Sequence, residues 1–203
     1  MTPMDKLKFK DERQIRALQV FAPVSQEKRI DCECYAEGYA TTYEPYVLYE
    51  TEDGPIYECF ERGCFDNCDM SDVIYQLNHQ GTVFARISNG SLIVEPDERG
   101  LFTAVDLSRT SAARNHYEEI DAGMITKMSW GFIPGDYYFD KATRTIRHRT
   151  VKKIFDVSGV SIPANNNTEI NARSWADGVI DLAARSEAAL DDRRRRLRLK
   201  TKL

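Results

Sequence analysis

Apolar and polar residues alternate in short segments over most of the chain, from about residue 13 to residue 163. Alternation with a period of two is typical of β-strands that bury one face. Turn signals separate the segments, among them the Asp-Gly-Pro run at 53–55 and the Ser-Asn-Gly run at 88–90. The segments between 83 and 108 favour an antiparallel meander, and we expect a β-rich fold.

Residues 110–123 depart from this pattern and predict a helix. Thr110 or Ser111 can cap its start, and Gly123 can end it. The expected apolar stripe consists of Ala112, Ala113, Tyr117 and Ile120.

The composition changes again after residue 164. Residues 165–174 are rich in Asn and resemble a linker, and residues 175–200 have helical propensity with a strongly basic end. We therefore expect one domain over 1–173 and a helical, basic tail over 174–203.

The segment MITKMSWGFIPG, residues 124–135, predicts a strand directly after the first helix. Met128, Trp130 and Phe132 share one face, and Ser129 and Gly131 lie on the other. Ser129 is then either a polar residue of a solvated strand face or a nucleophile with space beside it.

Length and composition indicate one soluble globular domain. The chain has 203 residues, of which 42% are hydrophobic and 30% charged. It contains no apolar run near the roughly 20 residues that span a bilayer, and its start lacks the apolar core of a signal peptide. We expect a cytosolic protein.

The formal net charge of −4 is unevenly distributed. Residues 191–203 carry seven basic and two acidic side chains, or +5, so the rest of the chain carries −9. An acidic body argues against a nucleic-acid-binding domain. The basic tail is either a solvated helix end or a contact for an acidic partner or a nucleic acid.

Five cysteines are expected to be reduced thiols: Cys32, Cys34, Cys59, Cys64 and Cys68. Their spacing does not match paired zinc knuckles, so a zinc module is a weaker alternative. A cysteine nucleophile near His79 is also disfavoured, because only Arg62 stands near these cysteines to lower a thiol pKa.

A serine nucleophile needs a base, and the chain has three histidines. His148 lies in an apparently exposed basic strand, where neighbouring cations oppose proton uptake. His116 lies within the predicted helix and is interpreted as a surface or packing residue. His79 ends an apolar-alternating strand just before Gly81, where the chain must turn, and strand ends often hold catalytic side chains.

Asp156 is a candidate for the group that orients the base. It stands between Phe155 and Val157 in an otherwise apolar strand, where a carboxylate is costly unless it is paired. A solvent-facing position or a structural ion pair would explain it equally well.

Four segments together resemble the prohead serine proteases of tailed phages and prophages, the HK97-type family, which shares its fold with herpesvirus capsid-maturation proteases. In chain order they are IDCECYAEGYATTYEPY (30–46), LNHQG (77–81), the run from EPDERGLFTAVDLS to MSWGF (95–132) and FDVSGVSIPANNNT (155–168). The resemblance implies an α+β, β-rich fold with a small antiparallel β-barrel flanked by helices.

The same resemblance implies His79 as general base and Ser129 as nucleophile, with Asp156 as the third member unless His148 serves. Asn78 and Gly131 match the family motif, and Gly131 is interpreted as leaving room for substrate. The arginines that the herpesvirus enzymes use for the oxyanion have no evident counterpart just after Pro163.

The implied activity is a serine endopeptidase without cofactor or metal. Its implied substrates are the scaffolding protein or the scaffolding segment of the major capsid protein, and the protease itself, inside the procapsid in the host cytoplasm. A homo-oligomer is compatible with the resemblance, and a membrane or nucleic-acid partner is not expected. The alternative is a non-catalytic β-rich capsid assembly or scaffold module.

Overall fold

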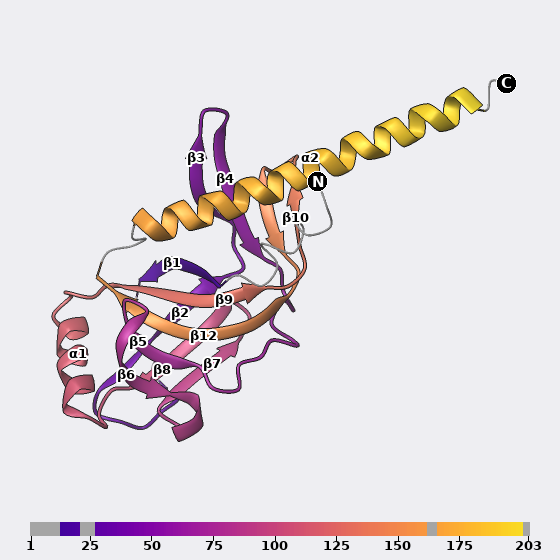
Figure 1. Cartoon of the computed structure of the whole chain (residues 1–203). Helices are drawn as coiled ribbons and strands as arrows, with labels where there is room; N and C mark the ends of the chain where they lie inside the picture. Colours follow the sequence, from indigo (N-terminus) through magenta and orange to yellow (C-terminus); the bar gives the residue numbers. More distant parts are fainter. Residues whose placement is uncertain (1–12, 21–26, 162–165, 201–203) are drawn as a thin grey trace.

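The computed structural model describes residues 13–20, 27–161 and 166–200. In these residues the strands form three open sheets, accompanied by two α-helices and one 3₁₀ turn (Figure 1). The five-stranded sheet has the order β1-β9-β12-β5-β6. Its strands are β1 (Gln14–Val20), β9 (Lys127–Pro134), β12 (Val151–Val160), β5 (Ile74–Leu77) and β6 (Gln80–Arg86).

Two smaller sheets complete the strand content. The four-stranded sheet contains β10 (Tyr137–Asp140), β11 (Thr145–His148), β4 (Gly54–Phe60) and β3 (Tyr46–Thr51), in that order. The three-stranded sheet contains β2 (Tyr35–Thr42), β8 (Gly100–Asp106) and β7 (Leu92–Pro96). The 3₁₀ turn η2 (Ile87–Asn89) lies between β6 and β7.

The β-rich α+β class is confirmed, while the barrel stays a prediction. Among the described residues the sheets are open and no closed barrel is found. Two pairings are parallel, β11 with β4 and β12 with β5, and both join strands far apart in the sequence. The alternation of apolar and polar residues reports the faces of a strand and not its neighbours, so the expected antiparallel arrangement did not include these pairs.

The central strand β9 is covered on both faces. Trp130 and Phe132 stack with ring centroids 4.1 Å apart, and Phe60 of β4 packs edge-on against both. Ser129, on the opposite face, is also fully buried. A solvated strand face is therefore the wrong interpretation of Ser129.

The first helix, α1 (Ser111–Asp121), begins and ends close to the expected residues. The Thr110 hydroxyl accepts a hydrogen bond from the amide of Ala113 at 3.1 Å and caps the helix. The buried stripe includes Ala113 and His116, while Ala112 is exposed. The positions 113, 116, 117 and 120 fit one helix face better than the expected set, because they follow the i, i+3, i+4, i+7 spacing.

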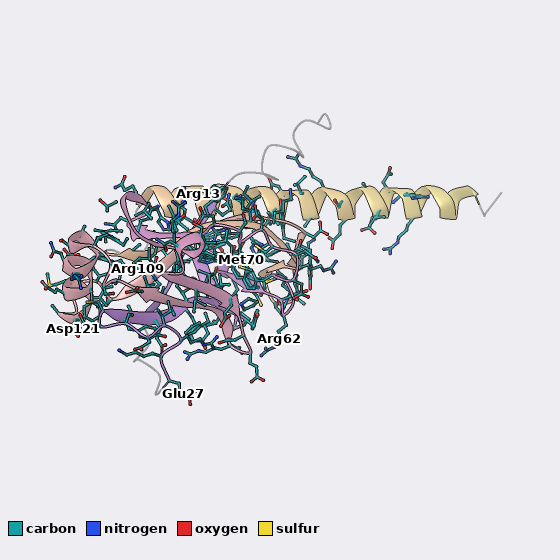
Figure 2. All side chains as sticks on the ribbon, turned by 90° about the horizontal axis from the view of Figure 1, so that it is seen from below. Arg13, Glu27, Arg62, Met70, Arg109 and Asp121 are labelled. Atoms are coloured by element: carbon teal, nitrogen blue, oxygen red, sulfur yellow. The ribbon has the colours of Figure 1, made fainter. Side chains whose placement is uncertain are left out.

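The second helix, α2 (Asn166–Lys200), starts where a linker was expected. The linker prediction is wrong for residues 166–174, because these residues continue directly into the helical tail segment. Trp175, Ala176 and Val179 are buried in a cluster with Ile56 and Ile146. The helix packs against β1, β3 and β10, and its C-terminal part projects beyond the sheets (Figures 1 and 2). The expected division at 173/174 falls inside this helix and stays a prediction.

A buried ionic cluster joins β1 to the second sheet. The Arg16 guanidinium donates to both carboxylate oxygens of Glu58, at 2.6 and 2.9 Å, and Tyr46 also donates to this carboxylate. Burial would raise the pKa of Glu58, but the charge of Arg16 and the hydrogen bonds of His148 and Arg16 outweigh it and hold the pKa at about 2. Arg16 also lies over the Trp175 ring, so this cluster anchors β1 under α2.

His148 belongs to the same cluster, and its expected exposure is wrong. It is fully buried, its Nε2 lies 2.9 Å from Glu58 Oε1, and its ring stacks on Phe60 and Trp175. The basic residues around it in the sequence did not reveal this, because alternate residues of a strand face opposite sides.

Candidate active site

A two-residue turn positions His79. Leu77 pairs with Gln80, so Asn78 and His79 form the whole connection between β5 and β6. Both have positive φ, 51° and 60°, which is the conformation of a type I′ hairpin turn. The chain therefore turns at Asn78 and His79, so that His79 lies in the turn itself, two residues before Gly81.

The Asn78 side chain ties this turn to the end of β12. Its Oδ1 accepts a hydrogen bond from the Ser161 amide at 3.2 Å, and its Nδ2 donates to the Ser161 hydroxyl at 3.3 Å. The backbone N–H of Asn78 also donates a hydrogen bond to the backbone carbonyl of Gly159 at 2.9 Å. Asparagine also tolerates positive φ better than most residues, so Asn78 suits both the turn and its attachment.

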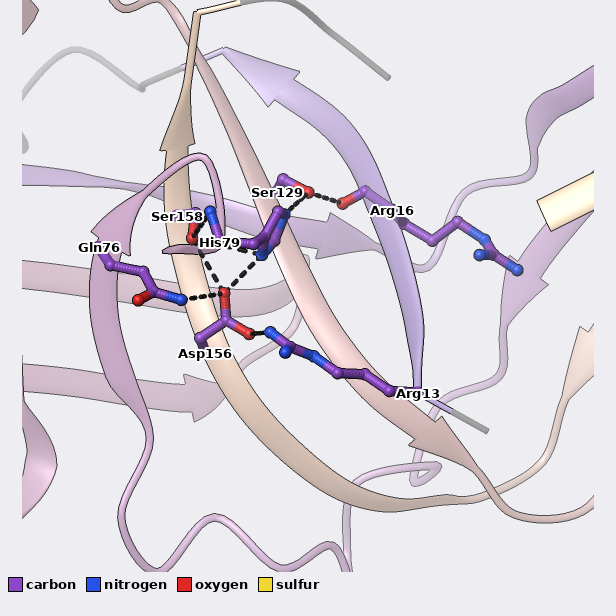
Figure 3. Close-up of polar contacts among 7 residues, drawn as sticks. All are labelled: Arg13, Arg16, Gln76, His79, Ser129, Asp156 and Ser158. Atoms are coloured by element: carbon purple, nitrogen blue, oxygen red, sulfur yellow. Dashed lines mark hydrogen bonds and ion pairs between the residues drawn. The ribbon is translucent and has the colours of Figure 1, made fainter. Parts of the chain in front are cut away.

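The turn places the His79 ring over the middle of the five-stranded sheet. Its Nε2 lies 2.6 Å from Ser129 Oγ, and its Nδ1 lies 2.5 Å from Asp156 Oδ2 (Figure 3). Ser129 is on β9 and Asp156 on the neighbouring β12. The structure thus brings the three expected residues into one hydrogen-bonded series, with the imidazole between the hydroxyl and the carboxylate.

The Ser129 hydroxyl has a second acceptor. Its Oγ donates to the carbonyl oxygen of Arg16 on β1 at 2.8 Å. A hydroxyl has one proton, so a bond to the Arg16 carbonyl competes with the bond to His79 Nε2. Rotation of the hydroxyl toward His79 is needed before the imidazole can remove that proton.

Asp156 is almost completely buried, with 1% of its surface exposed, and four side chains surround its carboxylate. The Ser158 hydroxyl donates to Oδ2 at 2.9 Å and the Gln76 amide donates to the same atom at 3.5 Å. The Arg13 guanidinium forms an ion pair with Oδ1, and His79 completes the set. Every oxygen of this buried carboxylate is therefore paired, as a buried charge requires.

These partners decide the charge of Asp156. Burial by itself would raise the pKa of Asp156. The hydrogen bond and charge of His79, the charge of Arg13 and the hydrogen bond of Ser158 outweigh burial, so the pKa lies below its ordinary value. Asp156 is thus ionised at neutral pH and can orient the N–H at Nδ1 of His79.

Gly131 leaves room for the ion pair beside it. A Cβ at this position would lie 2.5 Å from Asp156 Oδ1 and 2.7 Å from Arg13 Nε. The space was interpreted as room for substrate, and in the structure it holds the carboxylate and the guanidinium. Any side chain at 131 would push them apart.

Three residues of the site were not expected from the sequence, namely Ser158, Gln76 and Arg13. Ser158 stands two residues after Asp156 on one strand, so the shared face was a usable signal. Arg13 had no such signal, because 143 residues separate it from Asp156.

The other candidates lie away from this series. His116 is buried beside Tyr75, with its Nε2 3.3 Å from the hydroxyl, as the packing interpretation proposed. Burial raises the pKa of Cys64 and Cys68 to about 12, which keeps these thiols protonated and unsuited as nucleophiles. Within the described residues, no group of three or more His, Cys, Asp or Glu is arranged to hold a metal ion.

A serine hydroxyl, an imidazole and a buried carboxylate in series form the arrangement of serine hydrolases. Comparison with known protein families agrees with this class: residues 23–178 match the caudovirus prohead serine protease, and the chain belongs to that family. No curated protein and no solved structure matches the chain.

Family membership makes the chain a serine protease of phage capsid maturation, which acts within the procapsid and meets capsid proteins there. None of the described helices is long and apolar enough to span a membrane.

Proposed function

We propose that Ser129, His79 and Asp156 are the nucleophile, general base and orienting carboxylate of this endopeptidase. The observation that supports the proposal is the placement of the His79 ring, 2.6 Å from Ser129 Oγ and 2.5 Å from Asp156 Oδ2. Both distances are those of hydrogen bonds: the first lets the Ser129 proton pass to His79, and the second lets Asp156 orient the ring.

The reaction follows from these positions. Ser129 Oγ attacks the carbonyl carbon of the scissile peptide bond while its proton passes to His79 Nε2. The imidazolium, stabilised by Asp156, then gives this proton to the leaving nitrogen, and an acyl-enzyme remains. Water, deprotonated by His79, hydrolyses the ester and restores Ser129.

The proposed substrates are the scaffolding protein, or the N-terminal scaffolding segment of the major capsid protein, and the protease itself. The support is family membership together with the procapsid location that it carries. A small antiparallel β-barrel flanked by helices, as in the herpesvirus capsid-maturation proteases, also remains a proposal.

The test is co-expression of the protease with the major capsid protein and any scaffolding protein, followed by intact-mass measurement of each chain. Ser129→Ala removes the attacking oxygen, so we expect a folded protein whose cleavage rate falls by about 10⁶-fold. Ser186→Ala, on the exposed part of α2, is the control and should cleave normally. Normal processing by the Ser129→Ala protein would refute the assignment.

A further proposal concerns the C-terminal part of α2. Its cluster of arginines, residues 193–196, suits contact with an acidic surface of the scaffold or shell, which would carry the protease into the procapsid. The acidic remainder of the chain is unsuited to that contact. Self-cleavage is proposed to remove this segment later.

A further inference from the structure

Arg13 approaches the proposed site from the opposite edge of the sheet to His79. It stands just before β1, whereas Asp156 lies on β12, and β9 runs between the two strands. The Arg13 side chain has to cross β9 to reach Asp156 Oδ1 (Figure 3).

The crossing point is Gly131. Ile15 pairs with Gly131 on one side of β9, and Gly131 pairs with Asp156 on the other. A Cβ at Gly131 would lie 2.7 and 2.9 Å from Arg13 Nε and its terminal nitrogen, closer than real contacts allow. The sheet is therefore open to the guanidinium at the one residue of β9 in that region without a side chain.

The pair is unlike an ordinary surface salt bridge. The Arg13 side chain is 39% exposed, but the Asp156 side chain is only 1% exposed, so the carboxylate is screened little by water. The guanidinium also lies over the Phe155 ring, 5.3 Å from its centroid, which fixes its position. Arg13 is therefore held where its charge acts on Asp156.

The other charged groups around the carboxylate have partners elsewhere. Lys153 of β12 pairs with Asp69 and lies over the Phe155 ring. Arg16 of β1 points to the other face of the sheet and pairs with Glu58. Among the described residues, the charged or titratable groups that act on Asp156 are His79 and Arg13. Asp156 thus sits between one cation that is permanent and one imidazole that gains and loses a proton.

We propose that Arg13, admitted by Gly131, is a positioning residue that fixes the Asp156 carboxylate and sets the basicity of His79. The negative charge of Asp156 stabilises the imidazolium form of His79. Arg13 offsets part of that negative charge and keeps a larger share of His79 as free base. The inference rests on the proposed catalytic roles of Ser129, His79 and Asp156.

The first test is the pH profile of peptide cleavage by Arg13→Ala. Removal of the cation leaves more of the Asp156 charge to stabilise protonated His79, so we expect kcat/KM to fall about tenfold at pH 6 and less than about threefold at pH 9. Arg13→Lys keeps the charge and should restore most of the activity at pH 6. Arg86→Ala is the matched control, because Arg86 is similarly exposed and also pairs with an aspartate, Asp72, away from the site.

If kcat/KM fell by the same factor at both pH values, and equally for Arg13→Ala and Arg13→Lys, Arg13 would have a structural role only and the proposal would be overturned. Gly131→Ala provides a second variant, because its added methyl group forces the pair apart without changing any charge. We expect the same greater loss at low pH, and less than additive effects when it is combined with Arg13→Ala. Additive effects would contradict a shared mechanism.

A second measurement needs no turnover. The chain has only three histidines, so the ring signals of His79 can be assigned by NMR and followed against pH in the inactive Ser129→Ala protein. With Arg13→Ala added, the midpoint of the His79 titration should move to higher pH, and with Arg86→Ala it should not. An unmoved midpoint overturns the role of Arg13. A moved midpoint, together with no substrate cleavage by the protein that keeps Ser129, refutes only the proposed proteolysis.

Discussion

Asp156 illustrates how the surroundings of one side chain decide its chemistry. The same carboxyl on a solvated strand would titrate near its ordinary pKa and would have no fixed partner. Here Ser158, Gln76, Arg13 and His79 fix both oxygens, so the carboxylate has one orientation and one charge state at neutral pH. His79 then has its Nδ1 proton held on the side of Asp156 and its Nε2 free to accept from Ser129.

Asp156→Asn tests this orientation. The amide has nearly the same shape, but its NH₂ group can donate to Nδ1, which leaves the proton of the neutral ring on Nε2, the wrong nitrogen for a base that must accept from Ser129. We expect a folded protein whose kcat falls by about 10⁴-fold, measured with a peptide substrate and with circular dichroism as the check on folding. Asp69→Asn, at an exposed aspartate, should leave kcat unchanged. Turnover above a tenth of the normal value would exclude Asp156 from the triad.

The hairpin of β5 and β6 positions the base through its backbone. A two-residue turn with positive φ at both residues follows the twist of the strands, so the ring of His79 has a defined direction. The Asn78 side chain fixes the turn to Ser161, the residue directly after β12, and β12 is the strand that holds Asp156. Because β5 also pairs with β12, the distance between the His79 imidazole and the Asp156 carboxylate is held constant by these two neighbouring strands.

Substitutions of Asn78 test whether the backbone conformation of the turn controls the position of the His79 ring and thereby kcat. Asn78→Gly keeps the positive φ and should lower kcat less than about threefold. Asn78→Val strains a β-branched residue at φ 51°, shifts the turn and should lower kcat by about 10²-fold, since a displacement of about 1 Å has such an effect.

Arg144→Val is the control for backbone strain. Arg144 also has φ 51°, but it lies between β10 and β11, which belong to another sheet than the site. Both Val variants should lower the melting temperature, and only the one at Asn78 should lower kcat. Equal kcat for the two would contradict the positioning role of the turn.

At the scale of the whole molecule, the described residues form three sheets with α2 laid across β1, β3 and β10. The first described side chains of α2 belong to the body, because Trp175, Ala176 and Val179 are buried, whereas Leu190 is exposed beyond it. Two functions therefore share one helix, namely closure of the core over Arg16 and projection of a basic end.

Two truncations should separate these functions. Removal of residues 175–203 takes Trp175 out of the core, and we expect a loss of several kcal/mol of stability, measured by thermal unfolding. Removal of residues 188–203 keeps that contact, so the melting temperature and peptide cleavage should be normal while incorporation into procapsids falls. Replacement of Arg193, Arg194, Arg195 and Arg196 by Gln is the control for charge, and normal incorporation of both proteins would refute the delivery proposal.

The sequence by itself determined the local elements and the identities of the central residues. Period-two alternation predicted the strands, and the Thr110 cap and Gly123 predicted α1. Such features are encoded within a few neighbouring residues, where backbone geometry fixes which side chains share a face. That His79, Ser129 and Asp156 meet was implied by the resemblance of their motifs to the prohead protease family. The start of α2 was missed because Asn-rich segments suit loops and helix starts alike.

Only the tertiary structure decided the strand neighbours, the burial of Ser129 and His148, and the partners of Asp156. Arg13 reaches Asp156 across a third strand at Gly131, and Arg16 binds Glu58 from another sheet. These contacts join residues that are 143 and 42 positions apart, and no local pattern reports which strands lie side by side. The electrostatics of the site depends on such contacts, because a charge acts over distance in space and not over distance in the chain.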